Sequence, residues 1–98
     1  MARGGSVTTS TSFSTDQLTG TAMGIMVQND DPTDNILVHV EVENANDPIH
    51  TDGDTSSHAI LGPGVQMPFF GTRGNLINLL QIASAANTPV ATWSVIEV

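Results

Sequence analysis

The chain has 98 residues, ten of them acidic and only two basic, which gives a formal net charge of −8 at pH 7. Nucleic acids and anionic membrane surfaces are bound by clustered cations, so this charge excludes both as expected partners. Because the chain has no cysteine, disulfides, thiolate nucleophiles and cysteine-based metal sites are excluded as well. We expect one domain with a modest core, and a small all-β domain without disulfides often gains stability by oligomerisation.

The composition indicates a folded domain with an unusually uncharged surface. Hydrophobic residues make up 39% of the chain and charged residues 12%, about half the ~25% that is usual in soluble domains. Ser, Thr, Asn, Gln and Gly must therefore cover much of the surface, which suits a subunit that neighbours partly cover. The first residues lack the apolar core of a secretory signal, and no apolar run reaches the ~20 residues of a membrane span. We therefore expect synthesis in a cytoplasm.

Residues 1–13 are predicted to form an N-terminal arm that precedes a domain over residues 14–98. Within the arm, the Thr- and Ser-rich segment 7–13 is typical of an edge strand without a strong apolar face. Such a strand depends on a partner. The candidate contact residues of the arm are Val7, Thr9, Thr11 and Phe13.

The next segments predict two strands joined by a turn. Residues 23–28 are a short apolar run bounded by turn signals, which indicates a buried strand. Residues 29–34 are rich in Asp and contain Pro32, and Asx side chains that bond nearby backbone favour a turn. A hairpin is therefore expected. In residues 35–43, one face carries Ile36, Val38, Val40 and Val42, and the other carries His39, Glu41 and Glu43.

The middle of the chain predicts a loop followed by two short strands. Residues 44–57 have few apolar side chains and are expected to be an exposed loop, after which residues 58–61 resume extended structure. The turn Gly62-Pro-Gly64 then precedes a strand over residues 65–70. Pro68 has no backbone N–H to donate, so this strand is expected to lie at a sheet edge or to be bulged.

Residues 75–87 fit either a helix or a strand. As a helix, Asn75 would be the N-cap, and Leu76, Leu79, Leu80 and Ala83 would share a face. As a strand, the alternation is weaker, but the neighbouring segments are all β, and residues 90–98 alternate well enough to need a hairpin partner. About seven short strands predict an all-β fold, a single small antiparallel β-sandwich of jelly-roll type with an extended N-terminal arm.

No residue pattern in the sequence assigns a catalytic residue, a metal site or a cofactor. His39, His50 and His58 lack metal-ligand spacing, and His39 is expected to be solvated or at an interface. The acidic residues of loop 44–57 could supply oxygen ligands for calcium, but the loop lacks the full ligand set of the known calcium loop. The sequence therefore does not decide whether this loop binds calcium. No Gly-x-Ser-x-Gly elbow occurs. The aromatic residues expected in the core are Phe69, Phe70 and Trp93.

The order of six segments carries a resemblance to a known group of proteins. These segments are Gln28-Asn29 after an apolar strand, Asn35-Ile-x-Val-x-Val, Leu61-Gly-Pro-Gly64, Met67 to Phe70, Leu79-x-x-Ile82-Ala83 and Val95-Ile-Glu-Val98. Over roughly residues 6–98, this order resembles the small β-sandwich virion proteins of tailed bacteriophages. That group includes capsid decoration or cement proteins and head-fibre and tail domains.

The resemblance implies a non-enzymatic structural protein. We expect it to decorate the outer surface of the capsid, after synthesis in the host cytoplasm, and to stabilise the capsid by bridging subunits of the major capsid protein. It is also expected to associate with itself as a homotrimer. His39, Glu41 and Glu43 join the arm residues as interface candidates. The alternatives are a head-fibre, neck or tail component of the same fold and a glycan-binding adhesion module.

Overall fold

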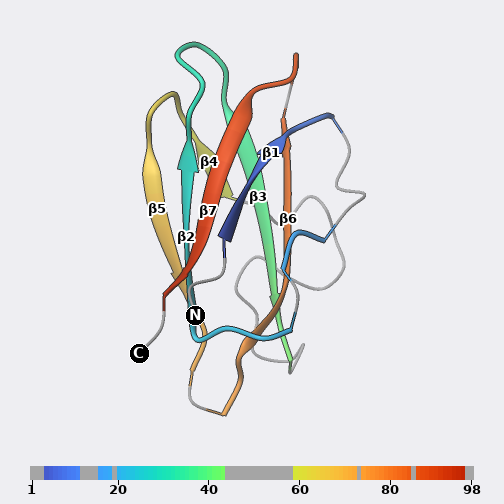
Figure 1. Ribbon diagram of the computed structural model, residues 1–98, viewed down its shortest axis with the longest axis vertical. Coiled ribbons are helices and arrows are strands. Elements are labelled where there is room, and N and C mark those ends of the chain that lie inside the picture. The colour runs from blue at the N-terminus through green and yellow to red at the C-terminus, as the bar shows by residue number, and fades with distance from the viewer. Residues whose placement is uncertain are drawn as a thin grey trace.

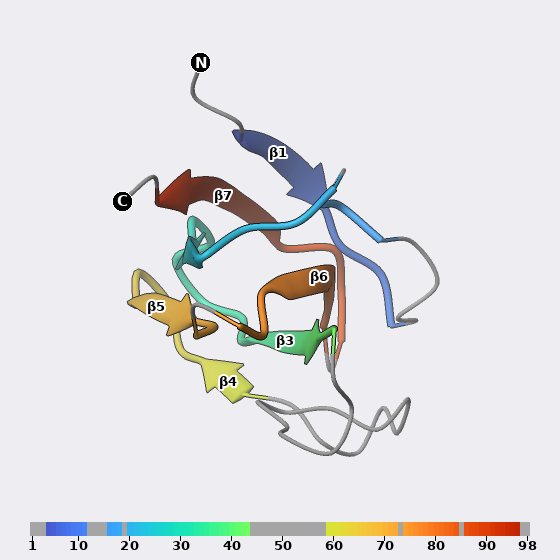
Figure 2. The ribbon, with the colours of Figure 1, turned by 90° about the horizontal axis from the view of Figure 1, so that it is seen from below.

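The computed structural model describes residues 4–11, 16–18, 20–43, 59–72, 74–84 and 86–96. They form two antiparallel sheets that pack face to face, as Figures 1 and 2 show. One sheet has the order β1-β7-β2-β5 and the other the order β4-β3-β6. The strands are β1 (Gly4–Thr8), β2 (Gly24–Asn29), β3 (Ile36–Val42), β4 (Ala59–Leu61), β5 (Gln66–Phe70), β6 (Ile77–Ser84) and β7 (Val90–Ile96). The predicted all-β sandwich is confirmed.

The strand order is that of a jelly roll with one strand missing. An eight-stranded jelly roll has two sheets of four, and its second strand lies at the outer edge of its seventh. Here β6 occupies the seventh place, and described residues of the connection between β1 and β2 bond its outer edge in antiparallel order. Ser84 N donates to Ser10 O, Gln17 N donates to Leu80 O, and Ala22 N donates to Ile77 O. This connection takes the place of the missing strand.

The described residues contain no helix, and hence no helix that is long and apolar enough to cross a membrane.

The strand β6 resolves the ambiguity of residues 75–87 and shows its cause. Glu41 pairs with Leu79 but Val42 pairs with Ile77, so Asn78 is an extra residue in a β-bulge. The bulge lets Ile77 and Leu80, three residues apart, both face the core. That spacing imitates one turn of a helix.

Two predicted hairpins are wrong. β2 and β3 lie in different sheets, as do β6 and β7, so each of these connections crosses from one layer to the other. Short turns and alternating strands are equally compatible with both arrangements, because a turn sequence does not specify which strand becomes the hydrogen-bonded neighbour. The strands β3 and β4 are consecutive and do pair with each other.

Pro68 lies on an edge strand, as predicted, and its missing donor faces outward. Asn29 N donates to Val65 O, and Gly71 N donates to Met23 O. Hydrogen-bonded pairs alternate in an antiparallel ladder, so Phe69 also bonds β2 whereas Pro68 does not. The proline therefore removes only a donor at the open edge of β5.

The core between the sheets is built from the inward faces of both layers. From β3, Ile36, Val38 and Val40 are fully buried and Val42 is nearly so, as the alternation predicted. The four-stranded sheet contributes Ile25, Val27, Phe69, Ala91, Trp93 and Val95. Phe70, predicted to be in the core, is 53% exposed, because it follows Phe69 on a strand and so faces the other side.

A buried amide closes one end of the sandwich. The side chain of Asn29, which is 0% exposed, places Nδ2 at 2.7 Å from Asp34 O, 3.1 Å from Leu61 O and 3.0 Å from Gly62 O. Its Oδ1 accepts a hydrogen bond from Asp31 N at 2.9 Å. Asn29 thus joins β2 to the start of β3 and to the end of β4 in the other sheet.

We predict that Asn29→Asp lowers the free energy of unfolding by about 3 kcal/mol or more, because a buried carboxylate would face carbonyl oxygens with no N–H to donate. Gln28→Glu is the matched control, since it makes the same chemical change at the adjacent, exposed position. Urea denaturation of both variants measures the difference. Equal stability of the two variants would contradict the assigned role of Asn29.

Candidate functional site

The candidate residues of the arm differ in accessibility. A strand was expected over residues 7–13, but β1 begins at Gly4, ends at Thr8 and pairs with β7 of the same chain, so of these candidates it contains only Val7. Val7 is half-buried against the core. Thr9 is 2% exposed, and its hydroxyl Oγ1 donates a hydrogen bond to Pro89 O at 2.7 Å. Thr11 is exposed, and Phe13 lies outside the described residues. Thr9 is therefore part of the interior of the sandwich.

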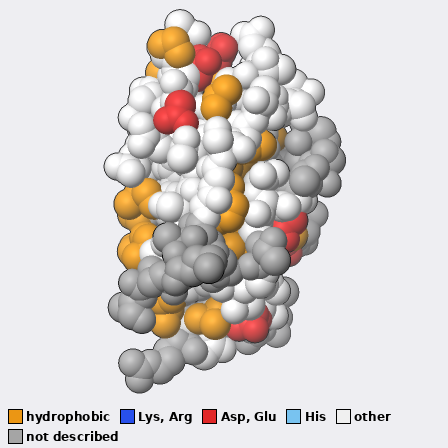
Figure 3. Space-filling model, viewed as in Figure 1, with side chains coloured by type: hydrophobic (Ala, Val, Ile, Leu, Met, Phe, Trp, Pro, Cys, Tyr) orange, Lys and Arg blue, Asp and Glu red, His pale blue; other side chains and the backbone are white. Residues whose placement is uncertain are grey.

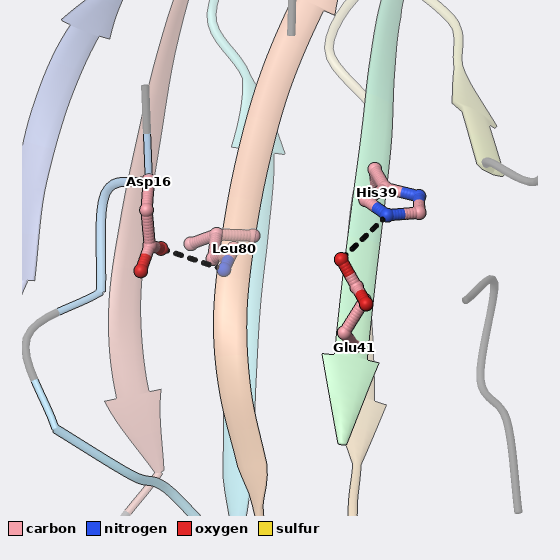
Figure 4. A network of polar contacts seen from close by, with 4 residues as sticks. All are labelled: Asp16, His39, Glu41 and Leu80. Carbon is pink, nitrogen blue, oxygen red and sulfur yellow. Dashed lines mark hydrogen bonds and ion pairs between the residues drawn. The ribbon is translucent and has the colours of Figure 1, made fainter. Parts of the chain in front are cut away.

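The candidates on β3 are also only partly accessible. His39 is 1% exposed, and its Nε2 lies 3.2 Å from Glu41 Oε2, as Figure 4 shows. Glu41 is 26% exposed, and Glu43 is exposed, with Oε1 accepting a hydrogen bond from Leu76 N at 3.1 Å. His39 is therefore not solvated in the folded chain, contrary to one of the two expectations for it. Ala83, which pairs with Leu37 on the same outer face, is 0% exposed, whereas Leu37 and Gln81 are half-buried.

Asp16, which the sequence did not single out, supports the edge of the same sheet. Its Oδ1 accepts hydrogen bonds from Leu80 N at 2.9 Å and from Leu18 N at 3.0 Å, and the first of these is drawn in Figure 4. The Asp16 carboxylate thus accepts the hydrogen bond from Leu80 N that a backbone carbonyl of a neighbouring strand would otherwise accept. Its role is to attach the connection to β6.

Within the described ranges, no group of three or more His, Asp or Glu side chains is placed to hold a metal ion. His50, His58 and the acidic loop 44–57, where calcium binding was left open, lie outside those ranges.

The acidic turn between β2 and β3 uses its carboxylates to hold the backbone. Asp31 Oδ2 accepts hydrogen bonds from Thr33 N at 2.9 Å and from Asp34 N at 2.7 Å. Asp34 accepts a hydrogen bond from Asn87 Nδ2 at 3.1 Å, and Asp30 accepts one from the Thr92 hydroxyl. The predicted Asx chemistry is confirmed. Each of these carboxylates stabilises this end of the sandwich.

An apolar patch lies on the outer face of the four-stranded sheet, and the sequence analysis missed it. It consists of Phe70, Pro68, Met26 and Ile96. Gly24 pairs with both Phe70 and Ile96, and a Cβ on Gly24 would lie 2.8 Å from Phe70 Cδ1, so the ring covers the glycine. In Figure 3, which shows this face, hydrophobic side chains follow β5 along the left side.

The row of side chains next to the apolar patch on the outer face is uncharged. The next row of the outer face pairs Gln28 with Gln66 and Thr92, and all three side chains are exposed. Strand alternation contained the signal that was missed, because Phe70 must share a face with Gln66 and Pro68. This patch is the candidate binding surface among the described residues.

The chain matches no protein-family model, and comparison with curated proteins and with solved structures likewise finds no match.

The carboxylate of Asp31, in the turn between β2 and β3, makes the stability of the fold depend on pH. Hydrogen bonds from the backbone of Thr33 and then of Asp34 lower the pKa of Asp31 below its ordinary value of 3.8. Because the folded-state pKa is depressed, the stabilisation is present above 3.8 and is lost as pH falls through the folded-state pKa.

We therefore predict that Asp31→Asn is less stable than the wild type at neutral pH and that this difference shrinks in acid. Urea denaturation at a series of pH values, extended below the ordinary pKa of aspartate, measures it. Asp30→Asn, which removes one negative charge from the same turn, is the control. A stability difference that does not change with pH would contradict this role of Asp31.

Proposed function

We propose that the protein is a non-enzymatic structural subunit of a tailed-phage virion that decorates the capsid exterior and stabilises it by bridging major capsid protein subunits. The resemblance in segment order supports this proposal, and so does the fold, since jelly rolls are widespread among viral capsid domains. Its net charge of −8 suits the outer surface, because packaged DNA would repel it inside.

The apolar patch is the observation that carries the proposal. Most of the surrounding face is polar, and a contiguous exposed apolar area on such a face marks a site of protein contact. Phe70 is 53% exposed and is fixed over Gly24, so it can enter a partner's pocket at little entropic cost. We assign the capsid contact to this patch.

We predict that Phe70→Ser weakens binding to capsids at least about tenfold, because burial of a large aromatic ring contributes strongly to binding. Val90→Ser is the matched control, since Val90 is 38% exposed on the same face but at its other end. Co-sedimentation with capsids that lack the protein measures binding, and circular dichroism verifies the fold. Equal binding by both variants would exclude the patch as the capsid contact.

Copy number in purified particles separates this proposal from its structural alternatives. A decoration protein bridges subunits over the whole shell and is present in many copies, whereas a head-fibre, neck or tail component is present in few. Quantitative mass spectrometry against the major capsid protein gives the ratio. Absence from particles would overturn both assignments.

A second candidate function, glycan binding, is favoured by the same ring and by the row of uncharged polar side chains beside it. Sugars stack their apolar faces on flat aromatic rings, and the amide and hydroxyl groups of Gln28, Gln66 and Thr92 can bond sugar hydroxyls. Trp93 does not offer such a surface, since it is 8% exposed. Binding to neutral oligosaccharides that Phe70→Ala abolishes and Phe70→Tyr retains would establish this function.

A further inference from the structure

The edges of the two sheets are protected unequally. The edge of β5 carries Pro68, and the edge of β6 is bonded at Ile77, Leu80 and Ser84 by described residues of the connection from β1 to β2. The edge strand β4 has only three residues. By contrast, β1 has five residues with no proline and no charged side chain. Natural sheets block their edges with such devices, so an edge without them is a template for another strand.

The backbone groups on the open side of β1 can be identified. Thr9 N donates to Pro89 O, while Asp30 N donates to Val90 O on the other side of β7. Hydrogen-bonded pairs alternate, so Gly5 and Val7 bond β7, and the N–H and C=O groups of Gly4, Ser6 and Thr8 point away from it. No described residue is bonded to these outward groups.

The side chains of β1 are complementary to a second β1 in the antiparallel direction. With Ser6 on a two-fold axis, Gly5 lies opposite Val7 of the second copy. A Cβ on Gly5 would be 3.3 Å from Trp93 Nε1, so the indole lies at the glycine, and Val7 is half-buried nearby. In the dimer, the second copy's Val7 would take the space beside Gly5, which has no side chain, close to the indole.

We propose that two copies of the protein associate through β1, antiparallel about a two-fold axis at Ser6, so that their four-stranded sheets form one continuous sheet. Backbone hydrogen bonds then join Ser6 to the second copy's Ser6, and Gly4 to Thr8 on either side of the axis. This contact is isologous and yields a dimer, which differs from the three-fold assembly that the resemblance implies. The inference does not depend on the proposed function.

The charge of the chain is compatible with this contact and gives it a signature. Neither β1 nor β7 contains a charged residue, so the net charge of −8 lies elsewhere on each copy. Mutual repulsion is screened over about 8 Å at physiological ionic strength and over less at higher salt. Dimerisation is therefore expected to strengthen as salt is added.

Analytical ultracentrifugation of the full chain over a concentration series tests the proposal. We expect a monomer–dimer equilibrium that Ser6→Pro weakens at least about tenfold, since the proline removes outward donors at the axis and leaves the β7 ladder intact. Gln66→Pro is the matched control: by the same alternation as Pro68 its donor faces the open edge of β5, and it should leave dimerisation unchanged.

A second pair of variants covers the case in which Ser6→Pro does not fold. Ser6→Asp sets two carboxylates opposite each other at the axis and should weaken the dimer, whereas Ser94→Asp, on neighbouring β7, adds the same charge away from the axis. A monomeric or trimeric wild type, or a dimer insensitive to Ser6→Asp, would overturn the proposal. A wild type that dimerises but does not bind capsids would count against the proposed function alone.

Discussion

The sandwich depends on the buried amide of Asn29. Two sheets that meet only through apolar side chains could slide past each other, but this amide bonds carbonyl oxygens at the start of β3 and the end of β4 while its own strand lies in the other sheet. A side chain that both donates and accepts is required, because Oδ1 also receives Asp31 N. The side chain of Asn29 therefore holds three parts of the fold in place. These are the acidic turn, the corner between β4 and β5, and the register of β2. Asn29 belongs to the Gln28-Asn29 segment of the resemblance, and these hydrogen bonds are its structural role.

Much of the fold could be predicted from local patterns, because one-sided burial imposes alternation. The strand β3 shows this directly, with Ile36, Val38 and Val40 at 0% exposure. Prediction was weaker where the backbone departs from regular pairing, as at Asn78, whose insertion gives Ile77 and Leu80 a helix-like spacing. The partners of each strand were not predictable from turns. The chain crosses from one sheet to the other between β2 and β3, and there Asn29 bonds Leu61 and Gly62, which lie outside any local sequence window.

The candidate sites were harder to predict than the strands. His39 was expected to be solvated or at an interface because it shares the polar face of β3 with Glu41. Burial also depends on what covers a sheet, and His39 is 1% exposed. Phe70 was expected in the core because its side chain is large. Strand alternation instead places it on the outer face of the sheet. The open edge of β1 could not be read from side chains at all, because its chemistry resides in the backbone of Gly4, Ser6 and Thr8.

The position of Pro68 has a consequence for the size of any assembly built on strand pairing. A sheet with two open edges can add copies without limit and so grow into a ribbon or fibre. Here the two edges of the four-stranded sheet are β1 and β5, and β5 presents a proline whose ring stands where an incoming carbonyl would need a donor. Once β1 is occupied, the joined sheet ends in a proline-bearing strand on both sides. Growth therefore terminates, and the chain can use its backbone for association without becoming prone to aggregation.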